Sequence, residues 1–439
     1  MKFTIMDTRI FRRGVRSGTV VRLLMLGAVI YFAGNVRAQE TASAPTDAET
    51  VKALLQRVQD LESEVKTLKS QVQALNPTPA NDISSTPVAA SSGTAPVSTA
   101  MAEHEVMAVR ADADPNMPRL QLRGFGDVNW KASDLHGQTN SFALGQLNLF
   151  LTSRINDKLS FLAETVIEAD QGSNEFGIEP ERLLMLYSVS DRLNLQIGRY
   201  HTGIGFYNTA YHHSAVMQTA MGRPFLFQFE DNGGILPIHN VGVSATGLIS
   251  NRLGLHYIAE VGNGRSARTS ISNPVQNVTD ENNGKAFNLG FYVRPEAIPG
   301  LRFGFSGYHD HVSPLGGANI SENIFAGHVV YQTSRFEFLN EAVVLQHTPD
   351  NSNVTVSIPG FYSQISKRFG NYRPYFRYEY VNVPGRDPLY SDVALVHGPR
   401  AGLRYELDES AAFKIEFGRD MRRNQGAVNL IGTQFSFAF

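Results

Sequence analysis

Arginine recurs on one face of two segments near the C-terminus that have the alternating pattern of β-strands. These residues are Arg373 and Arg377 in the first segment, and Arg400 and Arg404 in the second. If the apolar residues between them face outward, all four guanidinium groups point to the opposite side of the sheet. Closure of that sheet into a barrel would bring Arg123 and Arg154 of the first two strands beside them. Grouped cations in a water-filled interior produce an electrostatic field that selects among ions.

The segment 201–239 carries the charges that could face these arginines. It contains Glu230 and Asp231, and its only cationic side chain besides the histidines is Arg223. Acidic groups opposite a basic wall would set up a transverse field across the narrowest section. In the other interpretation, the interior charges form a network of salt bridges that keeps the barrel round. The residues alone leave both interpretations open.

Four histidines lie in or border the same segment, namely His201, His212, His213 and His239. Imidazole suits zinc, copper or nickel. However, no spacing among them is a recognised ligand motif, and adjacent rings on a strand point in different directions. We therefore expect no metal site and no cofactor.

Ser214 follows His213, which raises the question of a serine hydrolase. No aspartate or asparagine can be named as the third, orienting partner, so we expect no catalytic residue and no enzyme activity. The chain has no cysteine, which excludes thiol catalysis, disulfides and cysteine-based metal sites. A net charge of -2 argues against a nucleic-acid binder.

From residue 119 onward, apolar and polar residues alternate in ribbons of about ten residues, as in membrane-spanning strands. Short turn signals occur at 156–157, 191–192, 251–252, 299–300, 334–335, 370–371 and 408–409. Longer polar or glycine-rich connections lie between them, near 131–141, 169–180, 201–239, 262–284, 311–323, 347–356, 383–397 and 421–430. Seven short turns and eight long loops predict a sixteen-stranded, antiparallel, all-β transmembrane barrel over 119–439.

The last nine residues support this interpretation. Thr433, Phe435, Phe437 and Phe439 alternate with small or polar residues, so a strand here would present one aromatic face to lipid. This ending resembles the closing strand of bacterial outer-membrane barrels, whose terminal aromatic is read by the barrel-insertion machinery.

The first 38 residues read as a signal peptide, with a basic start, a short apolar run and a small-x-small site before Gln39. Residues 45–76 follow as a coiled coil with valine at each a position and leucine at each d position. The seam is Val51, Leu54, Val58, Leu61, Val65, Leu68, Val72 and Leu75. Arg57 and Glu62 have the spacing of a charge pair between parallel helices. Residues 77–118, rich in Pro, Ala, Ser and Thr, predict a disordered linker.

Two features of the coiled coil 45–76, here called the stalk, predict different numbers of helices. Valine at a with leucine at d favours a dimer, whereas the stretch from Arg57 to Glu62 resembles a short trimerisation motif of small coiled coils. The resemblance of the barrel to porins, which are commonly trimeric, favours the homotrimer.

Over 119–439 the organisation resembles bacterial outer-membrane porins, and the plan of stalk, linker and barrel is similar to relatives of the phosphate-selective porins. The resemblance implies that the third long loop, 201–239, folds inward and narrows the lumen. It also implies passive diffusion of small hydrophilic solutes across the outer membrane, with the stalk in the periplasm. Because that loop has one arginine and no lysine, a dedicated phosphate site is not expected. The alternative is an outer-membrane anchor whose coiled coil tethers the envelope.

Overall fold

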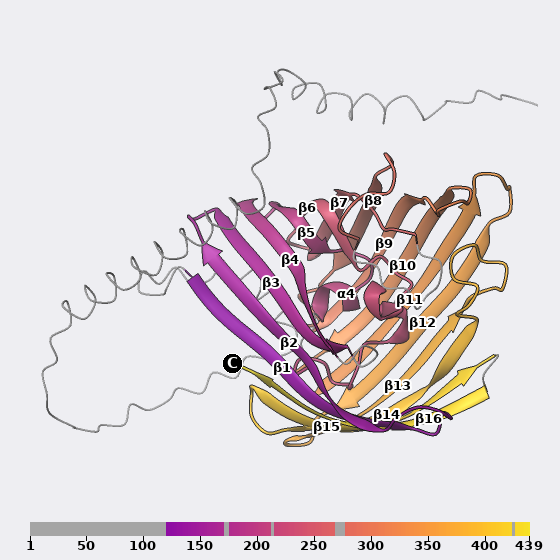
Figure 1. The fold of residues 1–439 in the computed structure, drawn as a ribbon. Coiled ribbons are helices and arrows are strands. Elements are labelled where there is room, and N and C mark those ends of the chain that lie inside the picture. Colours follow the sequence, from indigo (N-terminus) through magenta and orange to yellow (C-terminus); the bar gives the residue numbers. More distant parts are fainter. Residues whose placement is uncertain (1–119, 171–174, 212–214, 268–276, 424–425) are drawn as a thin grey trace, which may run out of the picture. The chain divides into compact units, whose positions relative to one another are not determined.

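The computed structural model describes residues 120–439 except 171–174, 212–214, 268–276 and 424–425. The predicted signal peptide, coiled coil and linker lie outside the described residues. The described chain forms sixteen strands that hydrogen bond in one closed antiparallel order, each to its neighbours in sequence, with β1 against β16 (Figure 1). Among the described residues, no helix has the length and the apolar run that a membrane-crossing helix needs.

The strands are β1 (Leu120–Ser133), β2 (Ser141–Arg154), β3 (Leu159–Asp170), β4 (Glu175–Ser190), β5 (Leu193–His201), β6 (His239–Ser250), β7 (Leu255–Gly262), β8 (Ala286–Val293), β9 (Leu301–Val312), β10 (Ile320–Gln332), β11 (Phe336–Pro349), β12 (Val356–Lys367), β13 (Tyr372–Asn382), β14 (Leu395–Glu406), β15 (Ala411–Arg422) and β16 (Gly426–Ala438). The predicted number of strands and the predicted fold class are confirmed.

Large apolar side chains are exposed at alternate positions along most strands, which identifies the outer face. Examples are Phe303 and Phe305, Phe361 and Ile365, and Phe413, Ile415 and Phe417, each between about two-fifths and three-fifths exposed. Their strand neighbours, such as Tyr362 and Ile358, are buried on the inner side. A continuous apolar exterior of this size is what contact with lipid requires.

The barrel closes through its last strand. Gly124 and Phe439 exchange two backbone hydrogen bonds of 2.9 Å, and the Phe439 ring lies over Gly124. A Cβ atom at position 124 would lie only 2.2 Å from that ring. Only glycine therefore leaves room for the Phe439 ring at this position. Phe435 and Phe439 are 41% and 64% exposed. The predicted aromatic outer face of the terminal strand is confirmed.

All seven predicted short turns connect the strands at one end of the barrel. Most of the eight long connections are shorter than predicted, and two of them differ most, 171–174 instead of 169–180 and 423–425 instead of 421–430. β4 begins at Glu175 because Phe176 and Ile178 continue the alternating outer face, and β16 begins at Gly426, soon after β15 ends at Arg422. Residues that were predicted to be loop therefore belong partly to strands.

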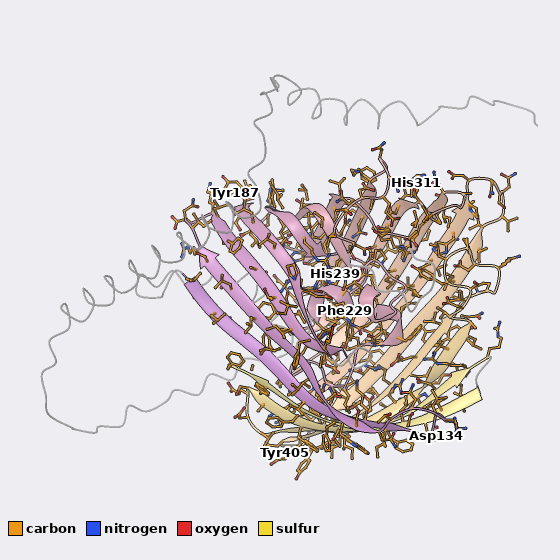
Figure 2. All side chains as sticks on the ribbon, viewed as in Figure 1. Asp134, Tyr187, Phe229, His239, His311 and Tyr405 are labelled. Atoms are coloured by element: carbon orange, nitrogen blue, oxygen red, sulfur yellow. The ribbon has the colours of Figure 1, made fainter. Side chains whose placement is uncertain are left out.

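The connection between β5 and β6, residues 202–238, is here called L3. It contains the short helix α4 (Tyr207–Ala210) and two single turns of 3-10 helix, η1 (Phe225–Phe227) and η2 (Glu230–Asn232). Figure 1 shows α4 within the ring of strands. In Figure 2, Phe229 of L3 and His239 at the start of β6 lie inside that ring, whereas Tyr187 and Tyr405 lie at its periphery.

Candidate functional site

L3 packs an aromatic cluster against the inner wall of the barrel. The rings of Tyr207 and Phe227 lie 5.9 Å apart, and both meet the edge of the Tyr362 ring of β12 at 5.7 and 5.9 Å. All three side chains are fully buried. Edge-to-face contacts of this kind add to the free energy gained from burying the rings. The apolar content of 201–239 therefore holds L3 against the wall.

Carboxylates on the wall accept hydrogen bonds from the backbone of L3. Glu341 of β11 accepts from the N–H groups of Phe206 and Tyr207 at 2.5 and 2.8 Å. These two N–H groups lie at the N-terminus of α4, which has no capping side chain of its own. The Glu341 carboxylate on the barrel wall therefore caps this helix. Glu260 of β7 accepts from Gly203 in the same way, at 2.9 Å.

Cations on the wall donate to the carbonyl groups of L3. The donors are Arg377 (to Gly222), Arg404 (to Val216 and Gln218) and Lys414 (to Ala215 and Ala220), at distances between 2.5 and 3.0 Å. Lys414 and Arg377 are almost completely buried. Each cation thus satisfies carbonyl groups that would otherwise be without a partner in the interior. L3 is bonded through its backbone to the walls on both sides of the lumen.

The predicted arginine group forms on β13 and β14. Arg373 is in register with Arg404, and Arg377 with Arg400. Glu406 lies 3.5 Å from both Arg373 and Arg404. These four guanidinium groups are therefore close together and interleaved with carboxylates.

The remaining members of the group have their own partners. Arg400 bonds to Asp420 at 2.6 Å, and Glu379 accepts from Arg377 at 2.7 Å. The interior cations of β13 and β14 are consequently neutralised locally by acids of the same wall.

Arg123 and Arg154 do not join this group in the way the sequence indicated. Arg123 is exposed and bonds to Gln121. Arg154 bonds to Asp157 in the turn that follows β2, at 2.7 Å. Both residues lie at the short-turn end of their strands. The register across the closed barrel gives the reason. Following the paired residues from Arg404 through Lys414 and Gln434 leads to Asn129 of β1, not to Arg123.

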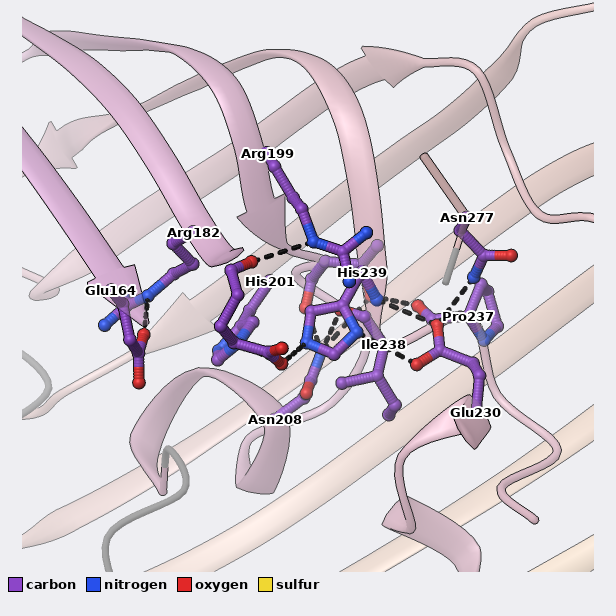
Figure 3. Close-up of polar contacts among 12 residues, drawn as sticks. Glu164, Arg182, Arg199, His201, Asn208, Glu230, Pro237, Ile238, His239 and Asn277 are labelled. Carbon is purple, nitrogen blue, oxygen red and sulfur yellow. Dashed lines mark hydrogen bonds and ion pairs between the residues drawn. The ribbon is translucent and has the colours of Figure 1, made fainter. Parts of the chain in front are cut away.

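Glu230, one of the two acidic residues of L3, also lies elsewhere than predicted. Glu230 accepts hydrogen bonds from the backbone and the ring of His239, and from Asn277, so it is at the β6 side of the lumen rather than at β13 and β14 (Figure 3). Burial would raise the pKa of the Glu230 carboxyl, but the adjacent His239 and the hydrogen bonds hold that pKa below its usual value. The side chain of Asp231 is outside the described part of the chain.

Arg223 holds L3 together internally. Its guanidinium donates to the carbonyl groups of Phe227 and Tyr211 at 2.6 and 2.7 Å, and it lies 4.0 Å from the centre of the Phe229 ring. Burial lowers the pKa of Arg223 to about 10, although Tyr207 and nearby carboxylates favour its charged form. The one arginine of the loop is thus a structural residue of the loop itself.

The structure brings together two of the four histidines that the sequence singled out. His201 ends β5, His239 begins β6, and the two are paired in register. Glu181 of β4 lies beside them, and the three are the only group of three histidine or acidic side chains with the mutual distances of a metal site among the described residues. His212, His213 and Ser214 lie outside the described residues. Sequence reasoning missed Glu181 because nothing in its neighbourhood marks it.

A second buried cluster joins the connection after β7 to the wall. Arg265 bonds to Glu322 and donates to the carbonyl group of Ile235 in L3 at 2.8 Å. His347 lies between Glu322 and Asp387, at 2.8 and 2.7 Å. These contacts join L3, the connections after β7 and β13, and the wall at β10 and β11.

A closed barrel of sixteen antiparallel strands with a loop held inside it is the fold of the bacterial outer-membrane porins. No family description and no curated protein matches the sequence. Solved structures do match the fold. The anion-selective porin from Comamonas acidovorans is 13% identical, with a TM-score of 0.51 over 73% of this chain and 99% of that one. OmpT of Vibrio cholerae in its trimer form is 10% identical, with a TM-score of 0.50 over 73% and 99%. OmpF of Salmonella typhi in complex with daunomycin is 12% identical, with a TM-score of 0.50 over 73% and 97%.

Proposed function

We propose that this chain is an outer-membrane porin through which small hydrophilic solutes and ions diffuse passively, and that it catalyses no reaction. The observation that carries the proposal is the position of L3, which is bonded to β7 on one side of the lumen and to β13 and β15 on the other. A sixteen-stranded barrel is too wide to be filled by its own wall side chains. L3 therefore determines how much of the interior is left for solutes.

The absence of cysteine in the chain makes a direct test possible, because a single introduced cysteine is unique. At Gly222 of L3 and at Gly177 of β4, an added Cβ meets no atom within 4 Å. We expect a bulky thiol reagent to reduce single-channel conductance in planar bilayers for the Gly222→Cys variant. The matched Gly177→Cys variant lies near the start of β4, away from L3, and should keep its conductance after labelling.

Two results would contradict the proposal. Purified protein that forms no channels in bilayers would remove the porin function altogether. Equal effects of labelling at positions 222 and 177 would show that L3 does not limit the conducting path. A liposome-swelling series with sugars of increasing size then gives the exclusion limit.

We further propose that the chain acts as a homotrimer in the outer membrane, with the coiled coil 45–76 in the periplasm. The heptads favour parallel self-association, and one of the similar structures is described as a trimer. The competing role is an envelope tether. Deletion of residues 45–76 should leave channel conductance intact while weakening the oligomer on native gels. If the deletion instead loosens the envelope and leaves the oligomer unaffected, the tether is correct.

A further inference from the structure

We propose that Glu181, His201 and His239 form a binding site for a divalent transition-metal ion, which would fasten both ends of L3 to strand β4. This inference does not depend on which solute passes the barrel. It starts from the convergence of three ligand-type side chains from three adjacent strands.

The backbone brings these side chains together in two ways. His201 and His239 are in register, and their ring centres lie 4.8 Å apart. Glu181 is placed by an irregularity in the pairing of β3 with β4, where the register shifts after Glu164. Such a bulge reverses the alternation, so Glu181 and its neighbour Arg182 are both buried. Bulges commonly re-aim a side chain toward a functional site.

The donor atoms are close enough for one ion. One ligand atom from each residue lies within 4.8 Å of the others. His239 Nε2 contacts Glu181 Oε1, and His201 Nε2 lies 3.9 Å from the same oxygen. A tetrahedral zinc ion separates its ligand atoms by roughly 3.4 Å. Small side-chain rotations would therefore suffice to seat the ion.

The surroundings also have the arrangement of a metal centre. His239 Nδ1 bonds to Glu230 Oε2 at 3.0 Å, and Glu230 is itself held by Asn277 at 2.8 Å (Figure 3). A carboxylate that accepts from one ring nitrogen fixes the tautomer that presents the other nitrogen as a ligand. Arg199 donates to the backbone carbonyl of Glu181 at 2.8 Å and so fixes that part of β4.

The donor set determines the class of ion. Two imidazole nitrogens and one carboxylate oxygen suit zinc, nickel, cobalt or copper, whereas calcium and magnesium prefer all-oxygen sites. Three protein ligands leave one position for water. Because the ligands come from β4, the end of β5 and the start of β6, the bound ion would cross-link the strands that carry L3.

The test uses the whole mature chain without a histidine tag, folded in detergent and freed of metal with a chelator. Calorimetric titration with zinc chloride should show one site per chain, and calcium chloride should show none. The His201→Asn variant should lower zinc affinity by roughly 100-fold or more, since even outer-shell changes cost 10 to 100-fold. Cobalt should give the visible absorption bands of a four-coordinate site in the wild type and not in this variant.

The control is His311→Asn, which removes an exposed histidine at the end of β9. It should leave zinc binding unchanged. Heat-dependent gel mobility of each variant shows that the barrel is folded. The proposal is wrong if folded wild-type protein binds no zinc at micromolar concentrations, or if His201→Asn and His311→Asn bind it equally. In the first case the three side chains form only a buried ion-pair cluster.

Discussion

Arg377 of β13 donates a hydrogen bond of 2.7 Å to the backbone carbonyl group of Gly222 in L3. The same guanidinium donates to Glu379, which in turn accepts from the N–H group of Phe225 at 2.6 Å. One ion pair on the wall therefore binds L3 through both a carbonyl group and an N–H group. At these contacts the interior charges of the barrel hold L3 in place.

Replacement of Arg377 by glutamine should destabilise both L3 and the barrel. The change removes the nearer cation of the buried Glu379 and leaves only Arg400, 3.9 Å away. Breaking a buried pair costs about 3–5 kcal/mol. We expect a lower unfolding temperature in heat-modifiability gels and larger, noisier single-channel currents. Arg419→Gln removes an arginine from the exposed face of β15 and is the control. Unaltered current noise together with unaltered stability would show that Arg377 does not hold L3.

Replacement of Lys414 by methionine should release the part of L3 near residues 215–220. The buried ammonium group bonds to two loop carbonyl groups and to Gln434. Each buried acceptor left without a partner costs about 1–3 kcal/mol. Chymotrypsin should then cleave after Tyr211, which is buried in the wild type. Lys367→Met, at the end of β12, is the control, and equal protection of both variants would exclude this role for Lys414.

A methyl group at Gly205 should disturb the entry of L3 into the lumen. Gly205 has a φ of +72°, and an added Cβ would approach the carboxylate oxygen of Glu341 to 2.4 Å. The substitution to alanine therefore strains the backbone and displaces the acceptor of the Phe206 N–H group, at a cost of about 1–3 kcal/mol for the strain. Gly222→Ala meets no atom and serves as the control. Urea unfolding midpoints that agree within error for the two variants would refute the prediction.

Arg400 should influence ion selectivity without influencing L3. Its guanidinium is partly exposed and is paired with Asp420 at 2.6 Å. It lies 3.9 Å from Glu379, which binds L3 but keeps its nearer partner Arg377 when Arg400 is replaced. Replacement by glutamine leaves Asp420 unpaired in the lumen, so the reversal potential in a salt gradient should shift toward cation preference. The pattern of chymotrypsin cleavage should stay that of the wild type. A reversal potential that does not move would mean that Arg400 lies outside the conducting path.

The amino-acid sequence by itself determined the strands, their number and the face that each presents outward. Alternation and turn chemistry act between residues a few positions apart, so the positions from Arg119 to Phe439 carry that information directly. The resemblance to porins singled out 201–239 as the loop expected to fold inward. Alternation also predicted that one group of arginines lies together, because they face the same side of two neighbouring strands. These are Arg373, Arg377, Arg400 and Arg404.

The tertiary structure alone decided what those groups contact. Glu341 is 135 residues from the Phe206 N–H group that it accepts from, and Lys414 is 199 residues from the carbonyl group of Ala215. The residues next to each partner in the sequence do not indicate which distant residue it will contact. Glu230 bonds to His239 instead of facing arginines, and a register shift in β4 brings Glu181 to two histidines. The path of L3 follows from the balance of all these long-range contacts, which exist only once the barrel has closed.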